Sequence, residues 1–174
     1  MALTYTPGGV SDNSYCSIDL ATTYFADSMR EQEWLSFSQS DRERALIEAT
    51  KQIENLGGSL SSPDSPKRNL FNGVPYVSTQ SLHFPRTIDI DKNGAKVIPI
   101  SVREAVIEQA FYLLNKKKNP NIIDADGLRK ENINSISIDG VSAGFTVGRR
   151  PNGICKECWD KIKPFIKRIT KTVV

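Results

Sequence analysis

The feature that most constrains the fold of this chain is an amphipathic helix predicted to follow Pro99. Ser101 and Glu104 have the spacing of a capping box, in which each side chain bonds a backbone N–H group of the first turn. Lys116, Lys117 and Lys118 complement the negative end of the helix dipole, and Asn119-Pro120 ends the helix. Apolar residues recur every three or four positions, which places them on one buried face: Val102, Ala105, Val106, Ala110, Leu113 and Leu114.

Three more helices are predicted. One begins near Ser17 or Asp19, and its apolar stripe is Ile18, Ala21, Tyr24, Phe25 and Met29. Trp34 and Leu35 form an apolar plug in the connector that follows. The next helix begins at Ser40, which forms a second capping box with Glu43, and it buries Ala45, Leu46, Ala49, Ile53 and Leu56 before Gly57-Gly58 ends it. The last spans residues 154–172, with Ile154, Cys158, Ile162, Phe165 and Ile169 on one face.

The remaining segments predict turns, loops and a hairpin. Residues 132–147 alternate apolar and polar side chains around Asp139-Gly140, which predicts a β-hairpin. Residues 57–79 are rich in Pro, Gly and Ser and predict a long loop, either a partner contact or a tolerated insertion. The fold class is therefore mainly α. We expect a small helical bundle with a hairpin between the third and last helices, an N-terminal arm (1–16) and a single domain (17–174).

Composition and charge limit the functional classes. The chain has 174 residues, 39% hydrophobic and 25% charged, which fits one domain. Its apolar runs are too short to span a membrane, and we expect no signal peptide, because the first residues lack a basic start and an apolar core. We expect a cytoplasmic protein with reduced thiols. Residues 1–102 carry 9 basic and 12 acidic residues, and residues 103–174 carry 14 and 8. The basic half indicates either a polyanion partner or a solvated face, and its candidate residues are Lys116, Lys117, Lys118, Lys161, Lys163, Lys167 and Arg168.

Catalytic and metal-binding patterns are scarce. Cys155 and Cys158 form a Cys-x-x-Cys pair, but zinc needs four ligands and only Cys16 and His83 could complete the set. Thiol redox chemistry is the alternative, and a buried apolar role for Cys158 is favoured over both. His83, the single histidine, alternates with Leu82 and Phe84 as an outward-facing strand residue would. No phosphate loop or His-Glu-x-x-His motif is present, so we expect neither an enzyme nor a cofactor.

The turn that begins at Asp89 partly matches a calcium-binding loop. Asp89, Asp91 and Asn93 alternate before Gly94, as the first ligands of such a loop do. The position of the bidentate glutamate, however, is Ile100. We therefore expect an ordinary turn stabilised by an Asx side chain, between two short strands.

An ordered set of short motifs extends over about residues 15–168. Its central residues are Gln80, Leu82, Phe84, Pro85, Arg86, Pro99, Val102, Ala105 and Glu108. Its other members are Tyr24-Phe25-Ala26, Trp34, the run from Ala45 to Thr50, the hairpin from Ile133 to Val147 and Lys163-Pro164-Phe165. In this order the motifs resemble the head–tail connector proteins of tailed bacteriophages, the adaptor or head-completion class, some of which carry a DnaT-like single-stranded-DNA-binding label. Loop 57–79 is longer than the corresponding link in the family, and the Cys-x-x-Cys pair lies outside the pattern.

The resemblance implies a structural virion protein at the neck, assembled in the host cytoplasm. Such a protein forms a homo-oligomeric ring, commonly a dodecamer, that binds the portal protein and a downstream tail or stopper protein. The ring extends the channel for double-stranded DNA without reading its sequence. The alternative is a replication-type single-stranded-DNA binder, for which Trp159 among Lys156, Lys161 and Lys163 is the candidate stacking site.

Overall fold

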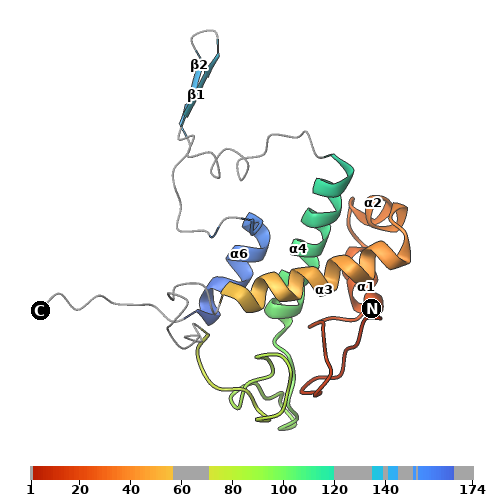
Figure 1. Cartoon of the computed structure of the whole chain (residues 1–174), viewed down its shortest axis with the longest axis vertical. Coiled ribbons are helices and arrows are strands. Elements are labelled where there is room, and N and C mark those ends of the chain that lie inside the picture. Colours follow the sequence, from red (N-terminus) through yellow and green to blue (C-terminus); the bar gives the residue numbers. More distant parts are fainter. Residues whose placement is uncertain are drawn as a thin grey trace, which may run out of the picture.

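The structure, a computed structural model, describes residues 2–56, 71–119, 151 and 153–166, and the backbone of 135–138 and 141–144. The described part contains five α-helices and one 3-10 turn, so the predicted mainly helical class is confirmed (Figure 1). These elements are α1 (Ile18–Phe25), α2 (Glu31–Ser36), α3 (Gln39–Leu56), α4 (Ile100–Lys118), α6 (Lys156–Ile162) and η1 (Lys163–Phe165).

Helix α4 is the centre of the bundle. It packs against α3 and α6, and α1 also contacts it (Figure 1). The predicted apolar stripe is confirmed: five of its six residues are buried, and Leu113 is half-buried. Ile107, Glu108, Gln109 and Phe111 are buried as well. The buried surface of α4 is thus wider than one amphipathic stripe, because neighbours cover the helix on several sides.

The predicted capping boxes of α3 and α4 are wrong. Helix α4 begins at Ile100 after an extended Pro99, and no side chain caps it. Ser101 is therefore already helical and cannot occupy the N-cap position. At α3 the hydroxyl of Ser38, rather than Ser40, accepts a hydrogen bond from the backbone N–H of Asp41 at 3.1 Å. Serines lie both before and inside the first turn of α3, and only the path of the entering chain selects the one that caps it.

Helix α1 begins as predicted and ends earlier. Ser17 is its N-cap and accepts a hydrogen bond from the N–H of Leu20 at 3.2 Å. The helix ends at Phe25, so the predicted place of Met29 on its buried face is wrong, and the side chain of Met29 is fully exposed. The connector contains α2. Trp34 is buried against Phe25 as expected, whereas Leu35 is exposed.

The last helix is shorter than the predicted 154–172. Helix α6 ends at Ile162 and continues as the 3-10 turn η1, which contains Pro164. Proline lacks an N–H group and clashes with the preceding turn, so the α-helix cannot continue through it. Ile154, Cys158 and Ile162 are buried as predicted, and Ile169 lies outside the described residues.

Residues 2–16 and 71–99 form a layer of loops below the helices in Figure 1. The strand expected around Leu82–Phe84 is wrong, because this segment bends and its Phe84–Pro85 peptide bond is cis. His83 is buried, with its ring centroid 5.2 Å from those of Phe71 and Phe84, so the prediction of an outward-facing side chain is also wrong. An alternating sequence places neighbouring side chains on opposite faces, but a face is exposed only when no other segment covers it.

The N-terminal residues fold back on the chain. Asn13 bonds the N–H of Thr4 and the carbonyl of Ala2, and Asp12 accepts from the N–H groups of Thr6 and Gly9. The hydroxyl of Ser81 donates to the carbonyls of Gly9 and Asp12. The N-terminal segment is therefore fastened to the 71–99 loop, whereas the division into an arm (1–16) and a domain (17–174) stays a prediction.

Strands β1 (Ser135–Ile138) and β2 (Val141–Gly144) pair antiparallel, with Ser135 opposite Gly144 and Ile138 opposite Val141. They lie within the range in which the hairpin was expected. Their turn, their side chains and the rest of 132–147 lie outside the described part, so the extent and facing of that hairpin stay a prediction. Residues 57–70 of the expected loop 57–79 also lie outside it.

Candidate functional site

The motif from Gln80 to Arg86 is a folded scaffold in the loop layer. Gln80 bridges the two sides of this loop: its Nε2 donates to the carbonyls of Leu82 (2.7 Å) and Pro85 (3.0 Å), and its Oε1 accepts from the N–H of Val77 (2.9 Å). Because all these polar groups are used within the loop, the amide fixes the shape of the loop. Gln80 thus holds the loop in shape and positions the residues between Val77 and Pro85.

Arg86 is the most heavily bonded residue of this motif. Its guanidinium forms a bidentate ion pair with Asp89, at 2.7 and 2.9 Å, and donates to the carbonyl of Asn72 at 2.8 Å. It lies over the rings of Phe84 and Phe165, with its Cζ atom 5.0 and 5.1 Å from their centroids. Both charged side chains are almost fully buried. Arg86 therefore joins the loop layer to the C-terminal turn η1, and its burial leaves little of the guanidinium accessible to a phosphate.

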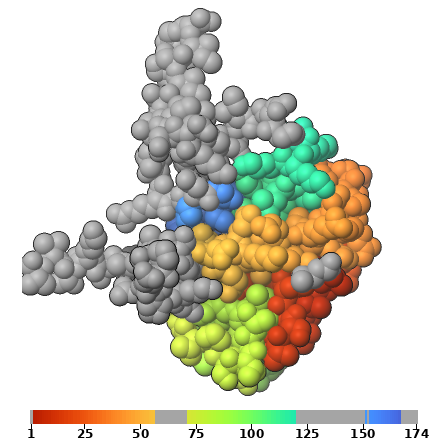
Figure 2. All heavy atoms as spheres, in the orientation of Figure 1, coloured from red at the N-terminus to blue at the C-terminus, as the bar shows by residue number. Residues whose placement is uncertain are grey.

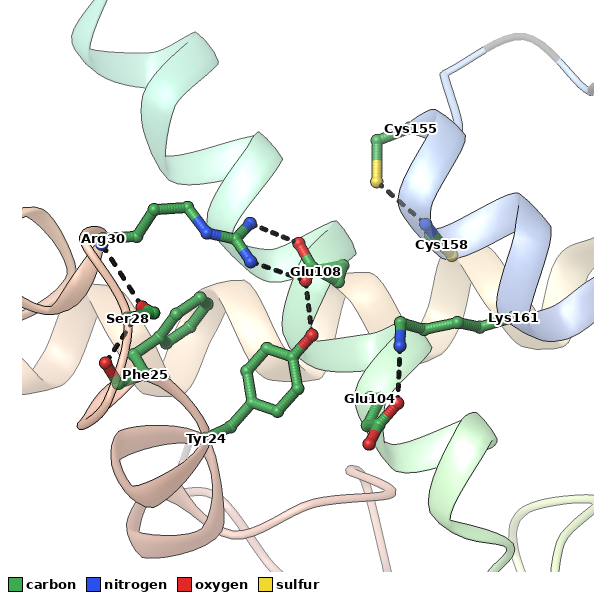
Figure 3. A network of polar contacts seen from close by, with 9 residues as sticks. All are labelled: Tyr24, Phe25, Ser28, Arg30, Glu104, Glu108, Cys155, Cys158 and Lys161. Carbon is green, nitrogen blue, oxygen red and sulfur yellow. Dashed lines mark hydrogen bonds and ion pairs between the residues drawn. The ribbon is translucent and has the colours of Figure 1, made fainter.

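Glu108 is the centre of a second buried network, drawn in Figure 3. Its carboxylate accepts two hydrogen bonds from Arg30, at 2.7 and 2.8 Å, and one from the hydroxyl of Tyr24, at 2.6 Å. Arg30 in turn lies over the rings of Phe25 and Phe111. Burial alone would raise the pKa of Glu108, but the hydrogen bonds from Arg30 and Tyr24 outweigh it and hold the pKa below its usual value.

This network ties α4 to α1 and to the turn before α2. The other predicted motif residues on this helix, Val102 and Ala105, are fully buried, and Pro99 precedes its first turn. A buried carboxylate paired in this way is charged and already neutralised. Its contacts with Arg30 and Tyr24 therefore join three separate segments of the chain.

Of the five predicted basic residues that the structure describes, three are paired with acids. Lys117 contacts Asp41 at 2.8 Å, Lys161 contacts Glu104 at 2.5 Å, and Lys163 contacts Asp160 at 2.8 Å. Lys116 and Lys118 are exposed and lie over the rings of Tyr112 and Phe37. Lys167 and Arg168 lie outside the described residues. The described lysines therefore do not form one unneutralised basic surface.

The cysteine pair lies in the core. Cys155 is the N-cap of α6, and its sulfur accepts a hydrogen bond from the N–H of Cys158 at 3.3 Å (Figure 3). Cys158 is fully buried, as predicted. Its hydrogen bond with Cys155 and its burial raise the pKa of the Cys158 thiol, and burial raises that of Cys16 to about 12. Such thiols are protonated and weakly nucleophilic.

The described residues contain no group of three or more His, Cys, Asp or Glu side chains that could hold a metal ion. At the partial calcium motif, Asp91 accepts hydrogen bonds from the N–H groups of Asn93 and Ala95, and Gly94 makes the bend with a φ of 80°. Asp89 is instead turned toward Arg86. The segment is therefore the Asx-stabilised turn that was expected, although an isolated bridge between Ile90 and Lys96 replaces the two short strands.

A shallow open groove of about 220 Å³ lies between α3 and α4. Leu113, Leu114 and Ala45 contribute its apolar lining, and charged residues, including Asp41 and Lys117, complete it. The groove is smaller than the roughly 300–1,000 Å³ that is usual for small-molecule sites.

Sequence reasoning missed two buried polar anchors. Gln109 is fully buried; its Nε2 donates to Gln52 and to the carbonyl of Gly153, and its Oε1 accepts from the N–H of Cys155. Tyr15 donates to Glu54, and its oxygen accepts from the N–H of Phe84. A polar residue at a core-facing helical position is the available sequence signal for Gln109, since its spacing from Val102 and Ala105 places it near the stripe.

Sequence reasoning also missed an exposed apolar surface on the loop layer. Val74, Tyr76, Ile88 and Ile90 are exposed by 59, 48, 62 and 57%. We call these four residues the apolar ribbon, since 74–76 pairs with 85–87 through the Tyr76–Pro85 and Thr87–Val74 backbone bonds. This segment is rich in turns, and its apolar residues follow neither a helical nor a strand period. The sequence therefore gives no indication that they are exposed.

The profile of one protein family, described as "Putative DnaT-like ssDNA binding protein", matches residues 1–150. The chain belongs to this family. The matched range contains the N-terminal loop, α1 to α4 and the apolar ribbon, and it ends before α6. No curated protein and no solved structure matches the chain. No helix in the described ranges has the length and apolar character needed to cross a membrane.

Proposed function

We propose that the chain is a structural virion protein, an adaptor or head-completion subunit that forms a ring between the portal and the tail and lines the DNA channel. In this proposal it acts without catalysis and without a cofactor, at the neck of the particle. The resemblance in the order of motifs from Tyr24 to Phe165 suggests this role. The observation that supports it is a contrast. The polar motif residues bond partners inside the fold, whereas the apolar side chains of the ribbon are exposed to solvent.

The polar motif residues that could do chemistry are used inside the fold. Gln80, Arg86 and Glu108 each bond internal partners, and the three cysteines are buried. The apolar ribbon, in contrast, exposes four large side chains to solvent. Exposed apolar groups of this kind are typical of surfaces that bind other proteins. This contrast favours an assembly protein over an enzyme.

Single-stranded-DNA binding is the second candidate, because the family description names it. It needs an aromatic side chain on which a base stacks beside free positive charge. Trp159 is half-buried, and its neighbours Lys156 and Lys163 both contact Asp160, at 3.1 and 2.8 Å. These ion pairs neutralise part of the charge that a nucleic acid would need at this site.

The deciding experiment is negative-stain microscopy of the full chain, alone and mixed with the portal of the same phage. We expect rings, alone or on the portal. Absence of rings in both samples, together with binding of a short DNA single strand that weakens with salt and is lost in Trp159→Ala, would establish the DNA-binding role instead.

A further inference from the structure

A second exposed surface lies at the corner between α1 and α2. Met29 is fully exposed and Leu35 is exposed by 43%. Three carboxylates surround them in the sequence, those of Asp27, Glu31 and Glu33. We call these five residues the acidic corner. None of the three carboxylates is ion-paired within the described part of the chain, and the guanidinium of the adjacent Arg30 is bound to Glu108.

The charges beside the apolar ribbon have the opposite balance. Lys92 is exposed, and Lys96 lies over the ring of Tyr76 at 4.7 Å and donates to the carbonyl of Thr87. Of the acids in the same loop, Asp89 is bound to Arg86, and Asp91 is occupied by backbone N–H groups. The ribbon therefore has two lysines and the carboxylate of Asp91 beside it in the sequence, whereas the corner has three carboxylates beside it and one cation near α2, Arg42, which lies over the ring of Trp34 at 5.6 Å. The balance of charge is positive at the ribbon and negative at the corner.

The two surfaces occupy different parts of the molecule. In Figure 2 the residues of α2 (orange) lie at the right, and the loop layer from 71 onwards (yellow-green) lies at the bottom. Two complementary surfaces at different places on one chain produce a head-to-tail contact between copies, which generates a ring when the rotation closes. Complementary charge around an apolar centre also fixes the partner and its register.

We propose that the apolar ribbon of one copy binds the acidic corner of the next copy. This inference rests on the proposed adaptor function and assigns the subunit contact of its ring. The occupant is a second copy of this chain, because the corner supplies both the apolar side chains and the charge that the ribbon lacks.

A mixing experiment tests this assignment. The ribbon variant is Val74→Asp/Ile88→Asp, and the corner variant is Asp27→Lys/Glu33→Lys; all four side chains are exposed or half-buried. Each variant alone should lose the oligomer seen for the unmodified chain by mass photometry, with at least about tenfold weaker self-association. Mixed one to one, the two variants should form a dimer that does not grow, because each copy retains one intact surface.

The controls separate folding from binding. Lys92→Glu changes one exposed charge and should weaken association without changing the circular dichroism spectrum. Ile100→Asp alters an equally exposed isoleucine, 64% accessible, in the first turn of α4 and should leave the rings intact.

Two outcomes would overturn the inference. If the corner variant associates normally while the ribbon variant does not, the ribbon binds another surface. If the unmodified chain forms rings that neither variant disturbs, this contact is wrong and the adaptor function stands. Absence of any ring, alone or with the portal, would remove both proposals.

Discussion

The buried ion pair between Glu108 and Arg30 allows a specific prediction, because the two side chains differ in their exposure to water. The side chain of Glu108 is 5% exposed and that of Arg30 is 39% exposed. Replacing Arg30 with Met keeps an apolar side chain over Phe25 and Phe111 but leaves a buried carboxylate without its cation. Loss of one partner of a buried pair costs about 3–5 kcal/mol, so we expect Arg30→Met to lower the free energy of unfolding by about that much.

The reverse substitution should cost less. In Glu108→Met the guanidinium of Arg30 can turn toward water, so no unpaired charge stays buried. We therefore expect the free energy of unfolding to fall by about 1–2 kcal/mol, which is the contribution of the lost hydrogen bonds. In the double variant no buried charge remains. Its loss should fall below the sum of the single losses, with a coupling free energy of about 2–3 kcal/mol.

Urea unfolding followed by tryptophan fluorescence measures all three losses, with Lys117→Met as a control. Lys117 pairs with Asp41 at the surface, with 68% of its side chain exposed, and its loss should change stability little. Equal losses in Arg30→Met and Glu108→Met would refute the reasoning, since unequal access to water is its premise.

The same network predicts a pH dependence. Because the pKa of Glu108 is lowered in the folded chain, its contribution to stability is present above the unfolded pKa and is lost as the pH falls through the folded pKa. In Arg30→Met burial should dominate and raise that pKa. The difference in stability between this variant and the unmodified chain should therefore shrink as the pH is lowered from 7 to 4. A difference that stays constant would contradict the assignment.

Three further predictions concern the scaffold. Arg86→Lys keeps the charge but loses the bidentate pair and the stacking, so its urea midpoint should fall by the equivalent of about 2 kcal/mol; an unchanged midpoint would contradict a structural role. Gln109→Leu leaves the buried N–H of Cys155 unpaired and should speed amide hydrogen exchange at residues 153–155, a result that an unchanged rate would exclude. The three buried cysteines should react with Ellman's reagent only after unfolding, and rapid labelling of the folded chain would refute their burial.

Local sequence patterns decide much of the fold. The stripe on α4 and the buried face of α3 follow from the spacing of apolar residues, and the start of α1 is narrowed to Ser17 or Asp19. Helical periodicity is a property of neighbouring residues, so it can be recognised without knowing where the chain goes. Where two serines compete, as at the start of α3, the correct cap is not determined locally.

Only the tertiary structure decides which side chains remain available for function. Sequence motifs identify Arg86 and Glu108 as motif residues and the lysines as candidate contacts to a polyanion. In the structure Arg86 and Glu108 are bound to residues distant in the sequence, Asn72 and Arg30, and Lys117 is bound to Asp41. The opposite holds for Met29 and the apolar ribbon, whose apolar character predicts burial and which lie exposed. Amphipathic helices are determined by local spacing, whereas exposure depends on which distant segments cover a residue. The candidate surface of this protein therefore follows from its packing and not from its motifs.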